Sequence, residues 1–370
     1  MNKVKVPFID LKQRYLEEKD DLLKAIKRVV SKGHLVLTDE VKQFEERVEK
    51  YTNSKHAISL NSGTDALMMA LWASGIKKND EIIQPVISFI ATTGATVHVG
   101  AKPVYCDVGP DQLIDTEQIE KYITKKTKAI MPVHWAGKTS NMTRIMDIAK
   151  KHNLLVIEDS AQSMGSYYNN KHGGTFGIAG AISCHPLKNL NALGDGGLLL
   201  TSNSKIYEKV KLMRNHGLKS RDNVVMYGVN SRLDSLNCEV LKMRLLKLKN
   251  IVSRRRRNAN LYQKLIAAPE IRFSQKNKNT KDAYVMFIVF AKKRDQLQKY
   301  LLKFGIETMI YYGTPLHLHK AAKVFGYKKG DFPIAESQCK EVLALPHHQH
   351  LSESQISLVS EKINKFYNVK

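Results

Sequence analysis

The sequence is poor in acidic residues, cysteine and tryptophan, and it has no long apolar run. Its four cysteines are far apart and form no CxxC pair: Cys106, Cys184, Cys238 and Cys339. This spacing argues against a zinc module or a disulfide scaffold and fits a reducing compartment. No stretch approaches the ~20 apolar residues of a membrane-spanning helix, and Met1–Pro7 lacks the apolar core of a signal peptide. We therefore expect a cytoplasmic protein with no metal site and no membrane partner.

Glycine and proline are modest in number, with 21 and 10 among 370 residues and no repeat between them. Collagen-like and low-complexity chains are thereby excluded. The shortage of acids leaves 59 Lys and Arg against 35 Asp and Glu, a net charge of +24. Such a charge favours anionic partners, and composition alone leaves nucleic acid, a membrane surface and acidic small ligands open.

Apolar spacing predicts two amphipathic helices over residues 10–51, the first ended by Gly33 and the second started by Thr38–Asp39. From His56 onward, short apolar runs alternate with helical stretches such as Asp65–Ala73 and Ile90–Val99. We expect strands at Ala57–Leu60, Glu81–Ile83, Pro103–Asp107, Ala129–Val133, Leu154–Asp159, Ala181–Cys184 and Gly197–Thr201. This alternation predicts an α/β fold, with a mostly parallel central sheet and helices on both of its faces.

The last third of the chain has a different pattern. A long helix is expected from near Asp234 to past Leu261, then a strand over Ala283–Val289 and a final helix over about Glu353–Phe366. We predict a large cofactor-binding domain at residues 1–250, which includes the N-terminal helices. A smaller α+β domain at residues 251–370 would follow it.

Three unusual segments follow predicted strands at the edge of the sheet where open α/β folds bind ligands. In Asn61–Ala66, Gly63 allows the backbone a close approach, and Thr64 lies at a helix N-terminus, which favours phosphate. A plain helix cap is the alternative interpretation. In Glu158–Gln162 a carboxylate suits a protonated ring nitrogen, and a helix cap by Asp159 is equally compatible with the pattern.

The third segment is Ser183–Leu190, which precedes the glycine cluster Gly194–Gly197. Here Lys188 lies just past a buried strand, in a setting that lowers the pKa of an amine and allows it to form a Schiff base. A lone lysine in so basic a chain is more often solvated surface. Together, however, a phosphate site, a carboxylate for a ring nitrogen and a Schiff-base lysine are the three anchors of pyridoxal phosphate.

With these motifs the chain resembles the DegT/DnrJ/EryC1/StrS family of sugar aminotransferases, within the fold type I group of pyridoxal phosphate enzymes. The resemblance covers nearly the whole chain in the family's order. Its motifs are Pro7–Leu11, Asn61–Leu67, Gly100–Val104, Pro132–His134, Glu158–Gln162, His185–Leu190, Arg214–Gly217, Asn230–Asp234, Pro315–Leu318 and Leu345–Pro346. It implies the fold of a type I transferase and pyridoxal 5′-phosphate as the cofactor.

The resemblance also implies roles for individual residues. Lys188 would bond to the cofactor, and Asp159 would pair with its pyridine nitrogen. The remaining cofactor contacts would be Gly63, Thr64 and Ser183 at the phosphate, Gln162 at the ring hydroxyl, and Phe89 stacked on the ring. For Phe89, a core position at a helix start is the alternative.

Residues later in the chain are implied to complete the site. Asn230 would reach the cofactor phosphate of the neighbouring subunit, so that a homodimer with shared active sites is the active unit. Tyr312 and His317 lie where the family contacts its substrate, although either side chain could equally well serve packing alone.

Two positions depart from the family pattern. Trp135–Gly137 replaces the usual Leu-Tyr-Gly, which changes the expected shape of the pocket and hence the sugar. Cys184 stands where Phe is frequent, and we expect it to pack against the sheet without being reactive.

The implied activity is a two-stage transamination. An amino acid donor, expected to be L-glutamate, gives its nitrogen to the cofactor while Lys188 moves the proton. A nucleotide-linked keto-sugar then takes the nitrogen and becomes an amino sugar, for lipopolysaccharide or polysaccharide biosynthesis. One branch of the family has His in place of this lysine and acts as a dehydratase, so Lys188 favours transamination.

Two other functions compete with this one. The first is a pyridoxal phosphate aminotransferase that acts on a free cyclitol or a keto-sugar acid. The second is a basic nucleic-acid-binding protein, suggested by Arg254–Arg257 and by the nine Lys and Arg, with no acid, between Val240 and Pro269. This region has no interleaved aromatic platform and no known binding module. We interpret it as a solvated helix face and expect no nucleic-acid partner.

Overall fold

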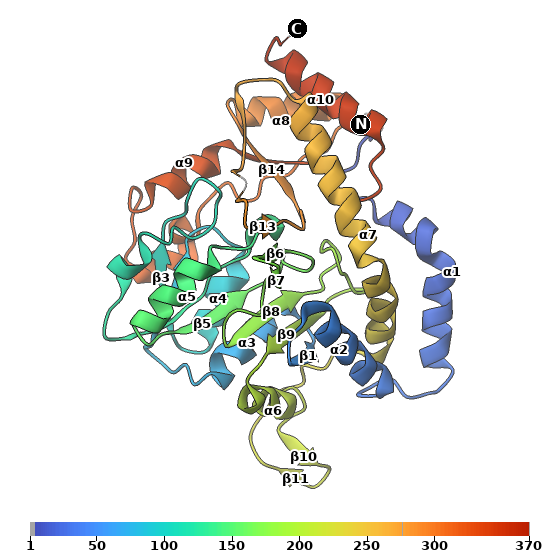
Figure 1. The fold of residues 1–370 in the computed structure, drawn as a ribbon, viewed down its shortest axis with the longest axis vertical. Helices are drawn as coiled ribbons and strands as arrows, with labels where there is room; N and C mark the ends of the chain where they lie inside the picture. The colour runs from blue at the N-terminus through green and yellow to red at the C-terminus, as the bar shows by residue number, and fades with distance from the viewer. Residues whose placement is uncertain (1–3, 276, 370) are drawn as a thin grey trace.

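The computed structural model describes residues 4–275 and 277–369 (Figure 1). Its centre is a seven-stranded sheet with the order β1-β9-β8-β5-β4-β2-β3. β9 runs antiparallel to both of its neighbours, and the other pairs are parallel. The strands are β1 (His56–Leu60), β2 (Glu81–Pro85), β3 (Lys102–Cys106), β4 (Thr127–Ile130), β5 (Leu155–Asp159), β8 (Ala179–Ser183) and β9 (Gly197–Thr201). The predicted α/β class is confirmed.

Helices cover both faces of this sheet (Figure 1). On one face lie α3 (Gly63–Ala73), α4 (Ile90–His98) and α6 (Ser204–Met213). On the other lie α2 (Asp39–Thr52), α5 (Met142–Lys151) and α7 (Ser235–Leu265). Along β9, Leu199 belongs to the first apolar layer, whereas Leu198 and Leu200 belong to the second. Because both faces of the strand are buried, its sequence is a continuous apolar run.

The N-terminal region forms two helices, as the apolar spacing predicts. α1 (Leu11–Val30) begins at Asp10, whose carboxylate accepts a hydrogen bond from the Gln13 amide, and it ends before Gly33, which has a φ of +70°. Thr38 occupies the N-cap of α2. Both helices pack against α7, so the N-terminal segment is held to the C-terminal half of the chain.

Beyond α7 the chain builds a smaller layer around a three-stranded antiparallel sheet. Its strands are β12 (Ile271–Phe273), β14 (Phe287–Ala291) and β15 (Val342–Leu345), and its helices are α8 (Arg294–Lys303), α9 (Pro333–Glu341) and α10 (Glu353–Phe366). The three strands, α8 and α10 share one apolar core with the end of α7, whereas α9 packs in a neighbouring apolar cluster. The final helix has the bounds that the sequence predicts.

The strand predicted over Ala283–Val289 is wrong in its first half, because β14 begins at Phe287. The amides of Ala283 and Val285 donate to the carbonyls of Gly137 and Ala136. The carbonyls of Tyr284 and Val285 accept hydrogen bonds from the Arg255 guanidinium. Tyr284 also has a φ of +46°. This stretch is therefore tied to a loop of the larger layer instead of a strand.

α7 runs without a break from residue 235 to residue 265 and passes beside both layers (Figure 1). The predicted domain boundary at residue 250 falls inside this helix. The helix is thus a shared element of both parts, and the division into residues 1–250 and 251–370 stays a prediction.

The arginine run of α7 is not simply a solvated face, and that interpretation is wrong for two of its four members. Arg255 is 3% exposed and donates to the carbonyls of Tyr284, Val285 and His347. Arg256 donates to three further backbone carbonyls. A guanidinium offers five donors and no acceptor, which suits it to collecting carbonyls in this way.

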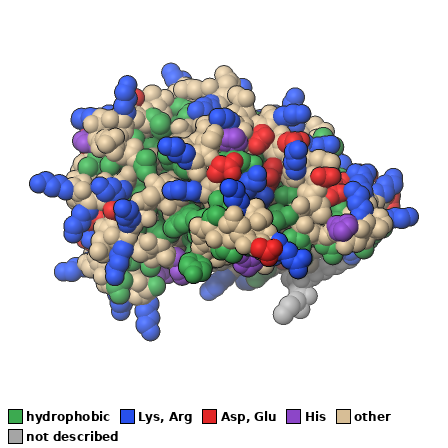
Figure 2. Space-filling view, turned by 90° about the horizontal axis from the view of Figure 1, so that it is seen from below, with side chains coloured by type: hydrophobic (Ala, Val, Ile, Leu, Met, Phe, Trp, Pro, Cys, Tyr) green, Lys and Arg blue, Asp and Glu red, His purple; other side chains and the backbone are tan. Residues whose placement is uncertain are grey.

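The remaining basic side chains are dispersed. In Figure 2, Lys and Arg side chains are scattered over the whole visible face instead of gathering in one stripe. A nucleic-acid site requires a continuous basic track, and this face does not present one. The charge is therefore no argument for nucleic-acid binding on this side of the molecule.

The other elements are short. They are β6 (Tyr167–Tyr168), β7 (Lys171–His172), β10 (Leu218–Ser220), β11 (Asn223–Val224) and β13 (Thr280–Lys281), with 3₁₀ turns at Ile119–Tyr122, Trp135–Gly137, Leu316–Leu318 and Lys320–Phe325. All four cysteines are buried and unpaired. Burial raises the pKa of Cys184 to about 12, and its side chain packs in the apolar layer behind β8, as expected. Within the described ranges, no helix has both the length and the apolarity needed to cross a membrane.

Candidate active site

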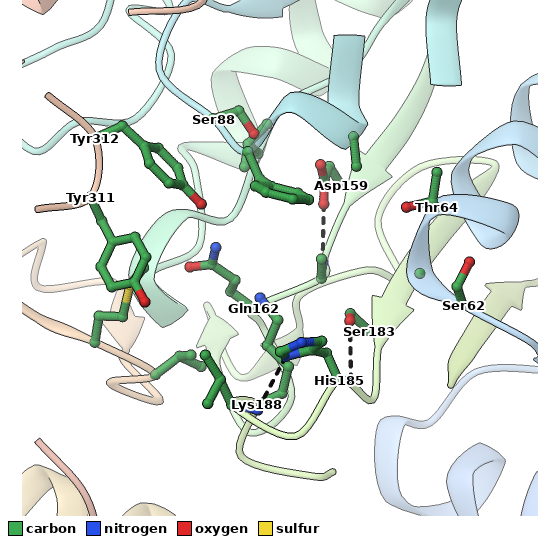
Figure 3. Close-up of a pocket in the computed structure, with 18 of the residues that line it drawn as sticks. Ser62, Thr64, Ser88, Asp159, Gln162, Ser183, His185, Lys188, Tyr311 and Tyr312 are labelled. Atoms are coloured by element: carbon green, nitrogen blue, oxygen red, sulfur yellow. Dashed lines mark hydrogen bonds between the residues drawn. The ribbon is translucent and has the colours of Figure 1, made fainter. Parts of the chain in front are cut away.

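A cavity of about 280 Å³ opens at the carboxyl ends of β1, β2, β5 and β8. Figure 3 shows residues of several strands converging on it: Ser62, Thr64, Ser88, Asp159, Gln162, Ser183, His185 and Lys188. Tyr311 and Tyr312 reach it from the segment that follows α8. The three motifs singled out in the sequence are therefore brought together in one place, where an α/β sheet binds its ligands.

The first wall of the cavity is the N-terminus of α3. Ser62 is the N-cap, and its hydroxyl accepts a hydrogen bond from the Asp65 amide. The helix cap is thus made by Ser62, while Thr64 and Ser183 line the cavity. A Cβ on Gly63 would come within 2.8 Å of the Ser183 Cβ, so the contact between helix and strand requires glycine. Free amides and the helix dipole make this wall suitable for a phosphate group.

Asp159 ends β5 and faces the cavity. Its Oδ2 accepts a hydrogen bond from the Thr92 hydroxyl at 2.6 Å, and its Oδ1 accepts one from the Ala161 amide at 3.1 Å. Burial raises its pKa, an effect that the two hydrogen bonds and the Lys188 charge oppose. Residues 160–166 form turns, not a helix, so the alternative that Asp159 caps a helix is excluded.

Behind Asp159, Glu158 points away from the cavity into a buried network. One of its oxygens accepts from His134 Nε2 at 2.8 Å and from the Gly174 amide, and the other accepts from the amides of Phe176 and Gly177. Because His134 Nδ1 accepts from the Ser140 amide, the ring proton is on Nε2, and a neutral imidazole is sufficient. This network fixes the end of β5.

Lys188 lies in the turn after β8. Burial lowers its pKa to about 8, and the nearby Asp159 carboxylate limits that fall. The side chain lines the cavity, so the alternative of a solvated surface lysine is excluded. Near neutral pH an amine with such a pKa has a far larger neutral, nucleophilic fraction than an ordinary lysine.

Gln162 is oriented by the segment that departs from the family pattern. Its Oε1 accepts from the Ala136 amide at 2.8 Å, which leaves the amide NH₂ group as the donor toward the cavity. Ala136 has a φ of +57°. The adjacent Trp135 is fully buried and packs on Tyr312, with ring centroids 5.5 Å apart. The departure from Leu-Tyr-Gly therefore supports the cavity wall from behind.

Aromatic side chains form the rim. Phe89 is 54% exposed and lines the cavity, so its alternative as a core residue is excluded. Its ring lies 6.3 Å from that of Tyr312. Phe8 and Tyr311 continue the rim, with centroids 6.0 Å apart.

Two predicted site residues are not brought to this cavity. His317 is 2% exposed, and its Nε2 lies 3.1 Å from Glu336 Oε1. Asn230 is exposed, and its side chain accepts from Arg232 Nε. Within one subunit, neither residue lines the cavity.

Several lining residues escaped the prediction from sequence. They are Phe8, Ser62, Ser88, His185, Asp195, Met286, Tyr311 and His347. Six of them lie inside the motifs or glycine cluster quoted above or next to a predicted residue, which is the signal that could have indicated them: Phe8, Ser62, Ser88, His185, Asp195 and Tyr311. Met286 and His347 have no such signal, because only the tertiary fold brings them to the site.

The residues present fit pyridoxal phosphate. A lysine of lowered pKa, a carboxylate and an anion-accepting helix N-terminus face one cavity, and the glycine in that N-terminus permits the close contact. Among the described residues no group of three or more His, Cys, Asp or Glu is placed to hold a metal ion.

The sequence model of the DegT/DnrJ/EryC1/StrS aminotransferase family matches residues 16–364. A pleiotropic regulatory protein of Geobacillus stearothermophilus is 38% identical over 98% of this chain and 98% of its own. The dTDP-3-amino-3,6-dideoxy-alpha-D-galactopyranose transaminase of Aneurinibacillus thermoaerophilus is 37% identical over 98% and 99%. The UDP-N-acetyl-3-dehydro-alpha-D-glucosamine 3-aminotransferase of Acidithiobacillus ferrooxidans is 34% identical over 97% of each chain.

Solved structures agree with this relationship. S. venezuelae DesV superposes with a TM-score of 0.96 at 34% identity, over 99% of each chain. NtdA from Bacillus subtilis, solved with bound cofactor PMP, has a TM-score of 0.90 at 28% identity, over 99% of this chain and 86% of its own. The fold of the whole chain is therefore that of solved aminotransferases.

Proposed function

The chain belongs to the DegT/DnrJ/EryC1/StrS aminotransferase family, and on this premise we propose that it aminates carbon 3 of a nucleotide-linked keto-sugar with L-glutamate as the donor. It is a pyridoxal phosphate-dependent sugar aminotransferase. The observation that supports the proposal is the single cavity joining Lys188, Asp159 and the N-terminus of α3. The names of two relatives add that their sugars are linked to dTDP and UDP and carry the nitrogen or the keto group at carbon 3.

The cofactor supplies an electron sink that carries nitrogen from donor to acceptor. Lys188 would hold the cofactor covalently between turnovers. When released, its Nζ would take the proton from the donor's α-carbon, and in the second stage it would deliver a proton to the sugar carbon. A pKa of about 8 suits both duties, because the amine can lose and regain its proton near neutral pH.

Asp159 is proposed to accept a hydrogen bond from the protonated pyridine nitrogen. Its raised pKa reflects burial, which its two hydrogen bonds and the nearby Lys188 charge only partly offset. A pyridinium would supply a cationic partner and bring the carboxylate back to its ionised form. Thr92 and Ala161 hold the two oxygens in place for this contact.

The phosphate is proposed to lie against the N-terminus of α3, held by Gly63, Thr64 and Ser183. Gln162 would donate its NH₂ group to the ring hydroxyl, and Phe89 would stack on the ring. Each of these side chains, or the Gly63 backbone, already lines the cavity, so no rearrangement is required of them.

Asn230 is proposed to act in the site of the neighbouring subunit, within a homodimer. It follows the hairpin β10–β11, which protrudes from the molecule (Figure 1). Val224, within this hairpin, and Tyr227, just after it, are 57% and 99% exposed. Exposed large apolar side chains on a protruding hairpin are typical of a contact with a partner.

Two half-reactions test the proposal. The pyridoxal phosphate enzyme is mixed with single amino acids, and loss of the lysine-bound cofactor's absorption near ~400 nm identifies the donor. The aminated enzyme is then mixed with candidate ketones, and return of that band identifies the acceptor. We expect L-glutamate in the first stage and a nucleotide-linked 3-keto-sugar in the second. Return of the band only with a free cyclitol ketone or a keto-sugar acid would contradict the proposed substrate.

A further inference from the structure

His347 is a buried polar residue of the cavity wall to which no role has been assigned above. It follows β15, lines the cavity and is 3% exposed. Neither of its ring nitrogens has a hydrogen-bond partner in the described parts of the chain. A buried imidazole carries at least one donor and one acceptor, and leaving both unpaired is unfavourable.

The position of the ring is fixed without those nitrogens. It stacks on Phe287, with centroids 5.5 Å apart and planes 28° apart, and contacts Tyr284 at 5.9 Å. The backbone carbonyl of His347 accepts from Arg255. A phenylalanine could make the same ring contacts, so packing does not account for the two nitrogen atoms.

Three other buried histidines use a ring nitrogen to hold the fold. His134 pairs with Glu158, and His317 pairs with Glu336. His172 Nε2 accepts from the Gly165 amide. The adjacent buried His348 also leaves both ring nitrogens unpaired within the described residues, but it does not line the cavity. His347 combines two unpaired nitrogens with a position in the cavity wall, which points to a ligand as the missing partner.

The charge state restricts what that ligand group can be. Burial, the Arg255 guanidinium and the neighbouring His348 all lower the pKa of His347, so its imidazole is neutral. A neutral imidazole offers one N–H donor and one acceptor. A hydroxyl can bond to either nitrogen, by donating to the unprotonated one or accepting from the N–H, whereas a carboxylate or diphosphate would favour a cation.

The location agrees with a sugar contact. Val285, Met286 and Tyr311 line the cavity with His347, and all four residues come from the C-terminal layer and the loops around it. Within one subunit, the groups proposed to hold the cofactor come from the central sheet, from α3 and from the loops that follow the strands of this sheet. The wall that contains His347 is thus supplied by a separate part of the chain from the cofactor wall.

We propose that His347 recognises a hydroxyl group on the sugar ring of the acceptor substrate, a role that rests on the proposed function. The hydroxyl makes a hydrogen bond with one ring nitrogen, and the other ring nitrogen is left to a second group of the ligand or to a bound water. The donor amino acid makes no use of His347. The residue would therefore affect the second half-reaction and leave the first unchanged.

Two variants separate hydrogen bonding from packing. His347→Phe keeps the stacked ring and removes both polar atoms, whereas His347→Gln keeps a donor and an acceptor at similar reach and removes the ring. We expect His347→Phe to lower kcat/KM for the nucleotide-linked keto-sugar about 3- to 10-fold, roughly the value of one neutral hydrogen bond, chiefly through KM. His347→Gln should retain most of the activity, and both should react normally with the donor.

The matched control is His348→Phe, which changes an adjacent buried histidine that does not line the cavity and should leave the sugar kinetics within about twofold. Keto-sugars lacking one hydroxyl at a time then identify the group. For the analogue without the contacted hydroxyl, wild type and His347→Phe should react equally.

The inference is overturned if His347→Phe matches wild type on every sugar, if His347→Gln is the weaker variant, or if the donor half-reaction falls in step with the sugar half-reaction. Normal donor kinetics in each variant show that the site is folded. If the wild-type enzyme accepts only ketones without a nucleotide, the proposed substrate is wrong. If the wild-type enzyme accepts the nucleotide-linked keto-sugar and only His347→Phe loses activity toward it, the proposed function and the role of His347 are tested separately.

Discussion

Glu158 and Asp159 are adjacent carboxyls on β5, yet their pKa values shift in opposite directions. Both are buried, which by itself raises the pKa. For Glu158, hydrogen bonds from His134 and from backbone amides outweigh burial and lower the pKa. For Asp159, burial outweighs its two hydrogen bonds and raises it. Because successive side chains of a strand face opposite sides, one carboxyl holds the fold and its neighbour faces the ligand.

A pair of amide substitutions tests this division. Asp159→Asn removes the proposed charge opposite the pyridine nitrogen, and we expect kcat/KM to fall about 10- to 100-fold, as for the loss of a charge-assisted hydrogen bond. Stability should change little, because burial already disfavours the ionised form. Steady-state kinetics and thermal unfolding measure the two effects. A fully active Asp159→Asn enzyme would contradict the assignment.

Glu158→Gln should act on stability instead. It replaces an ionised acceptor of four hydrogen bonds, so we expect unfolding to be easier by about 2–4 kcal/mol. A carboxyl whose pKa is lowered on folding contributes stability above its ordinary pKa and loses it as the pH falls through the lowered value. The difference between wild type and Glu158→Gln in urea unfolding should therefore shrink in acid. A difference that grows in acid would be inconsistent with the lowered pKa.

Replacing Lys188 tests the proposed nucleophile. Lys188→Ala and Lys188→Arg should abolish turnover and the absorption of the lysine-bound cofactor near ~400 nm. Arginine keeps the positive charge but does not give up its proton, so it separates charge from nucleophilicity. Lys205→Arg, at an exposed position of α6, serves as the control. Normal turnover in Lys188→Arg would show the assignment to be wrong.

The lowered pKa of Lys188 predicts a pH dependence for capture of the cofactor. Only the neutral amine attacks an aldehyde, and burial shifts its pKa from 10.5 to about 8. In the cofactor-free enzyme, the rate of pyridoxal phosphate capture should rise with pH and level off above about pH 8. Stopped-flow absorbance measures this rate, with a free lysine derivative as the reference. A midpoint near 10 would indicate a solvated lysine.

The arginine run offers a matched pair for stability. Arg255→Met leaves three carbonyls and the Gln349 amide oxygen without their donor, and we expect a loss of about 3 kcal/mol or more. Arg254→Met removes an exposed ion pair with Glu17 at 3.7 Å, which should cost at most about 0.5 kcal/mol. Urea unfolding compares the two. Equal losses would mean that Arg255 is not a structural residue.

The proposed sharing of active sites predicts complementation between two inactive variants. Lys188→Ala damages one subunit's own site, whereas Asn230→Asp places a negative charge against the phosphate in the partner's site. A mixed dimer would contain one site with both changes and one site with neither. Refolding the two variants together should therefore restore activity that neither has alone. Absence of recovery in verified mixed dimers would contradict the role of Asn230.

The sequence supports the prediction of the sheet, because β9 and its neighbours are apolar on both faces and are separated by helical spacing. It also indicates Gly63, Asp159 and Lys188, since each follows a strand and the parallel strands end at one edge. It misplaces the strand at residues 283–286, where the hydrogen-bonding partners are Ala136, Gly137 and Arg255 from distant parts of the chain. The spacing of apolar residues along the sequence does not indicate hydrogen-bonding partners that are distant in the chain.

The sequence also does not predict which way a side chain within a motif points. His317 lies in a family motif, yet the fold turns it toward Glu336 and away from the cavity. His347 and His348 are neighbours of the same type, and only the packing of Phe287 and Tyr284 determines that the first of them lines the cavity. Local composition is the same for both residues, so the difference arises from tertiary contacts alone.

In chain order, α7 lies between the residues proposed to bind the cofactor and most of the residues of the cavity wall proposed to face the sugar. Every group proposed to touch the cofactor precedes this helix in the chain, whereas Met286, Tyr311, Tyr312 and His347 follow it. A single genetic crossover within α7 would therefore join the cofactor site of one gene to the sugar wall of another. Such exchange offers a route by which one catalytic half could acquire new sugars without rebuilding its chemistry.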